Sequence, residues 1–324
     1  MIILGVESTA HTFGVGIVSD KGKILANIKD SYTSKDVGMI PHEIAEHHEK
    51  VAQKILKEAF KTAKVEWADI DLIAYSAGPG LDPVLWMGYN IVKEWAEKHD
   101  KQLVGVNHCA SHLSIGKLWN KLKDPVYLYV SGVNTQIIVQ EKKKGKSKSE
   151  GKYHVLGETL DIGLGNMLDK FGRILGLGFP AGPQIEVLSK KGKYVELAYT
   201  VKGMDTSFSG LLTKAQQLFE RKQASKEDLC FSLQETAFAM CAEVAERALA
   251  HSGKKELLLV GGVGANKRFC EMLELMCKER GAKFYKVPMD LAGDQGAMIA
   301  WEGFLRKESY GDMEVNPHWR ADEV

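Results

Sequence analysis

Short apolar runs alternate with polar turns along the first part of the chain. Met1–Glu7 and Phe13–Val18 are β-rich runs joined by the small polar turn Ser8–Thr12, and Lys23–Ile28 follows a turn at 20–22. Apolar runs joined by a glycine-containing turn are typical of β-hairpins. The N-terminal residues therefore predict three antiparallel strands.

A helical pattern begins at Pro41, a residue type favoured in the first turn of a helix. The apolar residues that follow recur with a period near 3.6 and predict a buried face: Ile44, Val51, Ile55, Leu56, Ala59 and Phe60. Beyond this helix the pattern predicts an alternation of strand and helix: strand Leu72–Ser76, helix Val84–Lys98, strand Gln102–Val106 and a helix to about Asn120.

The second half repeats this order of elements. Strand Val126–Val130 meets the tight turn Ser131–Thr135, a second strand follows, and a third, Tyr153–Glu158, comes after a charged linker. Helices and strands alternate from there: Leu164–Leu175, Pro183–Lys191, Leu211–Arg221, a long helix within Lys226–His251, Leu257–Val260, Lys267–Glu279 and Lys283–Lys286. No repeat of residues is visible, so the similarity lies in the pattern of elements.

Two α/β halves of this kind predict the fold of actin and the sugar kinases, an actin-like ATPase fold with two similar lobes around a central cleft. We expect the first lobe to comprise residues 1–124, completed by a C-terminal helix and tail at about 297–324. The second lobe would comprise residues 125–296. A chain of 324 residues exceeds one comfortable core, which agrees with this division.

Composition and charge narrow the class of protein. A net charge of +1 argues against a surface that coats nucleic acid without selectivity, although local basic patches remain compatible with it. The five cysteines form no C-x-x-C pair, which fits a reduced cytoplasm. The N-terminus has no basic leader, and no apolar run approaches membrane-spanning length.

The segment Asn107–His112 is the first candidate for chemistry. Its two histidines, His108 and His112, stand four residues apart at a helix start and project from one face, a spacing that suits one divalent metal. Such a pair can also be capping or solvent-facing. No glutamate follows the first histidine, so the helix lacks the general base of a zinc peptidase.

Four turns of small residues follow strands and can hold phosphates through backbone N–H groups. They are Ser8–Thr12, Ser131–Thr135, Gly261–Asn266 and Ala292–Ala297. Any one can be a mere turn, but four in equivalent places of two similar halves favour a nucleotide site, and none matches a P-loop. The loop Gly178–Pro183 can let a base or ribose lie close to backbone, or can simply be a stiff connector.

Several polar residues allow two interpretations. Asp161 and Asp294 lie next to glycines, where a carboxylate can bind metal or ribose or merely shape a turn. His48 lies on the apolar stripe and can be a core histidine, whereas His42 and His47 can face solvent. The lysine-rich stretch Glu141–Lys152 is better interpreted as a solvated hairpin tip than as an RNA-binding patch.

The chain resembles a known family at a dozen segments in the same order. GVESTAHT, PHEIAEHH, VGVNHCASH, LYVSGVNTQ, GETLDIGLGNMLDKFGR, LVGGVGAN and GDQGAMIAW are the most specific of them. They are similar to the archaeal and eukaryotic branch of the tRNA threonylcarbamoyladenosine synthases, the catalytic subunit of the KEOPS complex. That family was formerly described as O-sialoglycoprotein endopeptidases.

The resemblance implies a transferase that moves the threonylcarbamoyl group from threonylcarbamoyl-AMP to N6 of the adenosine 3′ of the anticodon in tRNAs reading ANN codons. It implies partner subunits of the KEOPS type: an atypical small kinase and small dimerising and regulatory subunits. One divalent metal, iron or zinc, would be held by His108, His112, Tyr129 and Asp294. ATP, AMP or the adenylate would lie on Tyr129, Val130, Ser131, Gly132, Val133, Asp161, Gly178, Gly182, Gly262 and Asn266, with Thr9 and His11 near the phosphates as catalytic candidates.

Several residues depart from the family pattern. Val133 replaces a glycine, and a positive φ there would strain its turn by about 1–2 kcal/mol. Gln295, Ala181 and Lys267 also differ, as do Asp82, Trp86 and Tyr89, of which the last two can be repacked core. The alternative function is therefore a catalytically weak nucleotide-binding scaffold in the same complex. A small-molecule kinase is disfavoured, since the metal ligands would serve no purpose there, and a peptidase is disfavoured further.

Overall fold

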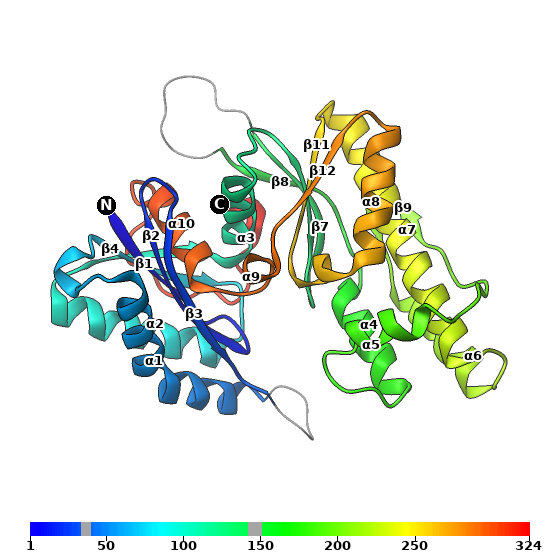
Figure 1. The fold of residues 1–324 in the computed structure, drawn as a ribbon, viewed down its shortest axis with the longest axis horizontal. Coiled ribbons are helices and arrows are strands. Elements are labelled where there is room, and N and C mark those ends of the chain that lie inside the picture. The colour runs from blue at the N-terminus through cyan, green and yellow to red at the C-terminus, as the bar shows by residue number, and fades with distance from the viewer. Residues whose placement is uncertain (34–39, 142–150) are drawn as a thin grey trace. The chain divides into compact units, whose positions relative to one another are not determined.

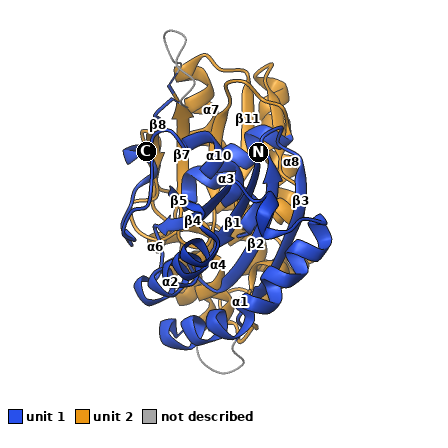
Figure 2. Cartoon of the chain, turned by 90° about the vertical axis from the view of Figure 1, so that its left-hand side faces the viewer, with its two compact units in different colours: residues 1–119, 141–153, 293–324 blue, residues 120–140, 154–292 orange. Residues whose placement is uncertain are grey.

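The computed structural model describes residues 1–33, 40–141 and 151–324 (Figure 1). These residues form two compact units, coloured separately in Figure 2. Unit 1 comprises residues 1–119, 141–153 and 293–324, and unit 2 comprises residues 120–140 and 154–292. The lobe limits expected from the sequence stay a prediction. Most of the expected hairpin tip at 141–152 lies outside the described residues.

Unit 1 is built on a five-stranded sheet in the order β3-β2-β1-β4-β5. The first three strands are antiparallel, as the hairpin pattern predicts, and β1 pairs in parallel with β4, which pairs in parallel with β5. The strand bounds are β1 Ile2–Glu7, β2 Thr12–Ser19, β3 Ile24–Ser31, β4 Leu72–Gly78 and β5 Gln102–Asn107.

The helices of unit 1 are α1 Pro41–Ala63, α2 Asp82–His99, α3 His108–Trp119 and α10 Gly296–Arg306. Side chains of a strand alternate between the two faces of a sheet. On β2, Phe13 contacts His48 of α1, whereas the neighbouring Gly14 and Gly16 face α10. Helices α1 and α10 therefore cover opposite faces of the sheet (Figure 1).

The C-terminal tail of unit 1 runs beside the carboxyl ends of β4 and β5. The backbone N–H of Asn316 donates to the carbonyl of Ala77 at 2.7 Å, and the side-chain amide of Asn107 donates to the carbonyl of Trp319 at 3.0 Å. Because Asn107 precedes α3 directly, the tail is tied to the start of the histidine helix.

Unit 2 repeats the sheet of unit 1. Its strands run in the order β12-β11-β6-β7-β8, with β6 antiparallel to β7 and parallel to β11, which is parallel to β12. This order matches β5-β4-β1-β2-β3, which confirms the duplicated pattern of elements. The bounds are β6 Val126–Val130, β7 Thr135–Gln140, β8 Tyr153–Glu158, β11 Glu256–Val260 and β12 Lys283–Lys286.

The longest helix of unit 2, α7, is buried along much of its length and packs in a large apolar core with Phe171, Phe208 and Phe269. The short helix α9 ends two residues before Asp294. The helix bounds are α4 Leu164–Ile174, α5 Gly182–Ser189, α6 Ser209–Glu220, α7 Lys226–Ser252, α8 Lys267–Glu279 and α9 Met289–Ala292. Among the residues that the structure describes, no helix combines the length and apolar character needed to cross a membrane.

His48 makes the stability of unit 1 depend on pH. It is fully buried on the core face of α1, and burial, reinforced by the charge of neighbouring His47, lowers its pKa to about 4. The unfolded chain therefore binds one more proton than the folded chain between pH 6.5 and 4. The stabilisation is present above pH 6.5 and is lost as the pH falls through this window, by roughly 3 kcal/mol.

We expect a His48→Leu variant to lose less stability than the wild type over that window. Urea unfolding of both proteins from pH 4 to 7 measures the difference. His42→Gln is the matched control because His42 lies on the same helix with 82% of its side chain exposed, and it should keep the wild-type pH dependence. Equal pH dependence of the wild type and His48→Leu would show that His48 is not responsible.

Candidate metal centre

Helix α3 presents the two histidines from its first two turns. The Asn107 carboxamide oxygen accepts a hydrogen bond from the backbone N–H of Ala110 at 3.0 Å, and the Ser111 hydroxyl donates to the Asn107 carbonyl at 2.8 Å, which fixes the helix start. His108 and His112 are both buried, and their ring centroids lie 4.8 Å apart. The spacing in the sequence therefore places both rings on one buried face.

Asp294 completes a cluster of three metal-ligand atoms. Its Oδ1 lies 3.2 Å from His112 Nε2 and 3.6 Å from His108 Nε2, and the ligand atoms of the three residues all lie within 4.8 Å of one another. Two imidazole nitrogens and one carboxylate oxygen are ligands that suit zinc or ferrous iron. The donor set of unit 1 thus fits the metal that the sequence predicts.

The charges of the cluster support ligand forms that bind cations. Burial lowers the pKa of His112 and favours the neutral imidazole. Burial alone would raise the pKa of Asp294, but the hydrogen bond from His112 and the positive charge of His108 hold it well below its usual range. Burial would also lower the pKa of His108, but the Glu7 carboxylate outweighs this effect and raises that pKa to about 9. This raised pKa favours a second proton on the His108 imidazole, and a bound cation would take the place of that second proton.

Glu7 is a residue of this site that the sequence analysis did not identify. It ends β1, is fully buried, and its Oε2 lies 3.0 Å from His108 Nδ1. Thr9 is also buried, and its hydroxyl lies 2.5 Å from Glu7 Oε1 and 3.2 Å from His108 Nδ1. The one signal in the sequence is an acidic side chain at the end of an otherwise apolar strand.

The other candidate residues of the sequence analysis lie in different places. His11 is half-buried in unit 1, close enough to Asp294 for its positive form to lower the pKa of that carboxyl. His42 is exposed and lies 3.4 Å from Glu46. Tyr129 is buried in β6 of unit 2, and its place among the ligands stays a prediction.

The residues from Tyr129 to Asn266 that are predicted to bind nucleotide belong to unit 2, and several have structural roles there. Asn266 caps α8 by accepting from the Phe269 N–H at 3.0 Å, and its amide donates to Gln234 at 3.0 Å. Gly261, just before the predicted Gly262, has a φ of 94°, and a Cβ there would lie 2.3 Å from the carbonyl oxygen of Val130. The turn therefore packs closely on the end of β6.

Asp161 is held by many hydrogen bonds within unit 2. Burial would raise the pKa of its carboxyl, but the bonds that it accepts keep the pKa well below its usual range. The donors are the hydroxyls of Ser207 and Thr159 and the backbone N–H groups of Ile162, Phe208 and Ser209. The carboxylate thus anchors its own loop to the start of α6, in keeping with the turn interpretation, and its contact with ribose stays a prediction.

Two departures from the family pattern have a local explanation. Val133 is 69% exposed and, among the described residues, is not one of the non-glycine residues with positive φ, so the strain considered from the sequence is absent. Ala181 is buried and packs its methyl group toward Gly172, where a second methyl would clash at 2.1 Å. Neither substitution distorts the backbone of its loop.

Three other departures have packing or capping roles. Gln295 is buried and caps α10 by accepting from the Met298 N–H at 3.1 Å. Tyr89 is buried as expected for repacked core and contacts Tyr75, but Trp86 is 36% exposed and packs edge-on against Tyr89. The core interpretation thus holds for Tyr89 and only in part for Trp86.

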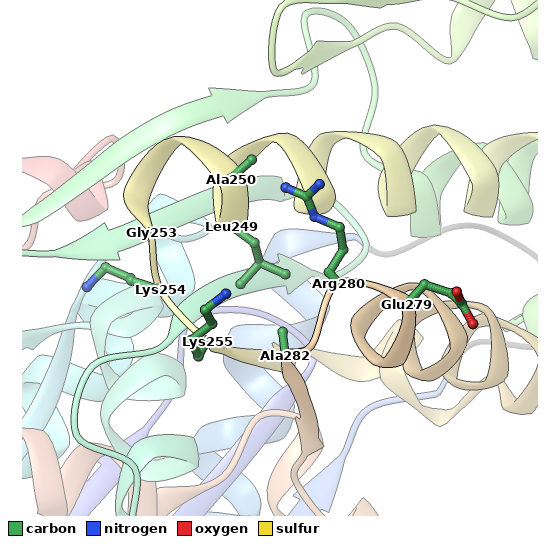
Figure 3. Close-up of a pocket in the computed structure, with 8 residues that line it drawn as sticks. All are labelled: Leu249, Ala250, Gly253, Lys254, Lys255, Glu279, Arg280 and Ala282. Atoms are coloured by element: carbon green, nitrogen blue, oxygen red, sulfur yellow. The ribbon is translucent and has the colours of Figure 1, made fainter.

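A surface pocket of about 410 Å³ lies elsewhere in unit 2 (Figure 3). It is lined by the last turns of α7 and α8 and by Lys254 and Lys255 before β11. The predicted nucleotide residues Gly262 and Asn266 follow the opposite end of β11, so the pocket is separate from them. Figure 3 shows Lys254 pointing away from the pocket, and its ammonium contacts Asp124.

Comparison with solved structures shows the fold. The chain is similar to HypF of T. kodakarensis with a TM-score of 0.65 and 16% identity, covering 95% of this chain and 48% of that one. It is also similar to component A of the (R)-2-hydroxyglutaryl-CoA dehydratase of Acidaminococcus fermentans, with a TM-score of 0.55 and 13% identity over 95% and 100% of the two chains. The predicted actin-like ATPase fold is confirmed.

Comparison with known sequences shows the family. Residues 23–301 match the family tRNA N6-adenosine threonylcarbamoyltransferase (TsaD). The enzyme of that name from Thermococcus kodakarensis is 50% identical over 331 residues, covering all of this chain and 98% of the relative. The enzyme from Thermococcus sibiricus is 51% identical, covering all of this chain and 99% of the relative. A probable bifunctional tRNA threonylcarbamoyladenosine biosynthesis protein of Methanocaldococcus jannaschii is 47% identical over all of this chain and 60% of the relative. The chain therefore belongs to the tRNA N6-adenosine threonylcarbamoyltransferase family.

Proposed function

We propose that this chain transfers a threonylcarbamoyl group from threonylcarbamoyl-AMP to N6 of the adenosine 3′ of the anticodon in tRNAs that read ANN codons. Family membership over the whole chain supports the reaction type. The single observation that supports a location for the reaction is that ligand atoms of His108, His112 and Asp294 lie within 4.8 Å of one another. These residues would hold one divalent metal, iron or zinc, and Tyr129 of unit 2 would complete the set.

The reaction exchanges one bond to the carbonyl carbon for another. The N6 amine of adenosine forms a C–N bond to the threonylcarbamoyl carbon, the C–O bond to the AMP phosphate breaks, and the amine gives up one proton. The bound metal would act as a Lewis acid on developing negative charge. Because an exocyclic amine is a weak nucleophile, we expect the protein to contribute mainly by positioning and electrostatics.

A direct transfer agrees with the state of the thiols. Burial raises the pKa of Cys230 and of Cys241 to about 12 and that of Cys277 to about 11, which keeps these thiols protonated and unreactive. On α3, the hydroxyls of Ser111 and Ser114 donate to backbone carbonyls. We therefore propose that no acyl-enzyme forms. His11, which is half-buried in unit 1, and His42 are the candidates to assist proton transfer.

The remaining parts of the proposal follow from the family. The adenylate would lie on Val130–Val133, Asp161, Gly178, Gly182, Gly262 and Asn266 of unit 2, with Thr9 and His11 of unit 1 near its phosphate. The names of the bifunctional relatives support a role in tRNA modification. The partners would be tRNA and KEOPS-type subunits, namely an atypical small kinase with dimerising and regulatory subunits, in the cytoplasm.

Nucleoside analysis tests the reaction directly. The chain is mixed with iron or zinc, partner subunits, threonylcarbamoyl-AMP and a tRNA that reads an ANN codon, and threonylcarbamoyladenosine is expected in the digested tRNA. The matched control is the same tRNA with guanosine in place of the target adenosine, which should remain unmodified. An unmodified target tRNA would contradict the proposal.

Val133→Gly tests whether the valine limits this reaction. The side chain is 69% exposed and lies in the predicted phosphate turn without backbone strain. We expect the variant to keep the wild-type rate within about threefold, about 0.7 kcal/mol in the barrier, because the turn has no backbone strain that a glycine would relieve. The rate of tRNA modification is the measurement. An inactive wild type beside an active Val133→Gly protein would instead identify a scaffold subunit.

A further inference from the structure

The Glu7 carboxylate lies in an environment that is costly for an unpaired charge. None of its side chain is exposed, and a buried carboxylate is tolerated only when it is paired and hydrogen-bonded. One oxygen, Oε2, lies 3.0 Å from His108 Nδ1. The other, Oε1, accepts from the backbone N–H of Thr9 at 2.8 Å and from its hydroxyl at 2.5 Å. Both oxygen atoms of the carboxylate are therefore held by hydrogen-bond partners.

This arrangement determines which ring nitrogen of His108 faces the ligand cluster. A carboxylate can only accept a hydrogen bond, so Nδ1 must carry the proton that lies between His108 and Glu7. The opposite nitrogen, Nε2, is the one that lies 3.6 Å from Asp294 Oδ1, beyond hydrogen-bond length. When Nε2 is unprotonated, two acceptor atoms face each other there, and a cation between them satisfies both.

The Thr9 hydroxyl reinforces this arrangement. It lies within reach of both Glu7 Oε1 and His108 Nδ1, but the much shorter contact is the one to Glu7. The hydroxyl of Thr9 thus donates its proton to the Glu7 carboxylate, and the carboxylate in turn accepts from Nδ1 of the His108 imidazole. The order of residues at the end of β1 builds a chain of contacts from Thr9 through Glu7 to His108.

We propose that Glu7 is a positioning residue of the metal centre, which holds His108 in the Nδ1-protonated form with Nε2 directed at the metal, and that Thr9 holds Glu7. The inference rests on the metal part of the proposed function and does not depend on the identity of the substrate. A carboxylate behind a ligating histidine restricts the orientation of the ring and raises its basicity, and its loss typically weakens metal binding by about 10–100-fold.

Zinc affinity of the full chain, without tRNA or adenylate, tests this role. We expect the dissociation constant for Zn²⁺, measured by competition with a chromophoric chelator, to rise about 10–100-fold in Glu7→Gln and by a smaller factor in Thr9→Val. Glu302→Gln is the matched control. It neutralises another fully buried carboxylate of unit 1, which is paired with Arg306 on α10 and should leave zinc affinity within threefold of the wild type.

A second measurement separates positioning from loss of fold. In the zinc-loaded wild type, ¹⁵N NMR of the histidine rings should show a proton on His108 Nδ1 and zinc on Nε2, and in Glu7→Gln the exchange of that Nδ1 proton with water should accelerate. A folded Glu7→Gln protein with wild-type zinc affinity, or zinc on Nδ1 in the wild type, overturns the inference. If zinc binding depends on Glu7 but tRNA is not modified, the proposed function fails and the inference stands.

Discussion

Replacing His112 by alanine is expected to remove most of the bound metal and to lower the rate of tRNA modification by about 10³-fold. The imidazole is buried, and its Nε2 lies 3.2 Å from Asp294 Oδ1. Removing the ring leaves a cavity, and it reduces the three clustered ligand residues of unit 1 to two. A Lewis acid contributes several kcal/mol to the transition state, and about 4 kcal/mol corresponds to about 10³ in rate. Metal analysis of protein purified without added metal and single-turnover modification of tRNA measure the two effects.

Ser114→Ala is the matched control for this variant. Ser114 lies on the same helix and is equally buried, but its hydroxyl donates to the Ser111 carbonyl, and it is not one of the three clustered residues His108, His112 and Asp294. We expect this variant to keep its metal and its rate within about threefold, since loss of one such hydrogen bond costs about 1 kcal/mol of stability. If His112→Ala keeps a full complement of metal, the cluster on α3 is not the metal site.

The periodicity of the chain was sufficient to predict the fold because each half has the same sequence of apolar runs. The hairpin before Ile28, the helix at Pro41 and the strand before Asn107 all follow from local spacing, and their order fixes the sheet. The histidine pair could be predicted for the same reason. A spacing of four on a helix is local information, and it needs only a helix start at His108 to place both rings together.

Contacts between distant buried polar groups could not be predicted in this way. Glu7 and His108 are separated by 101 positions, and no period in the sequence relates them. Asp161 and Asn266 illustrate the same limit, because each was assigned to nucleotide from its motif, while the structure shows that each also holds a turn or a helix start. A motif identifies which residues matter, but it does not distinguish contact with ligand from support of the loop.

Glycines explain how close helix α10 lies to the sheet of unit 1. Gly5 and Gly16 are direct partners across β1 and β2. A Cβ on Gly16 would lie 2.0 Å from the backbone nitrogen of Ala297, and one on Gly5 would lie 2.1 Å from that of Ala300. Both obstacles are backbone atoms, which cannot rotate away as a side chain can. Helix and sheet therefore touch backbone to backbone, and the helix begins at Gly296, two residues after Asp294.

Gly16→Ala is expected to lower the free energy of unfolding by about 3 kcal/mol, because the added methyl must push the start of α10 off the sheet. The same displacement moves Asp294 away from the histidines, so zinc affinity should fall even in the fraction that remains folded. Urea unfolding and zinc competition measure the two effects, and Gly311→Ala is the control, since a Cβ there meets no atom within 4 Å. A Gly16→Ala protein as stable as Gly311→Ala, within about 1 kcal/mol, would mean that α10 can shift without cost. The close contact would then not be what holds Asp294 in place.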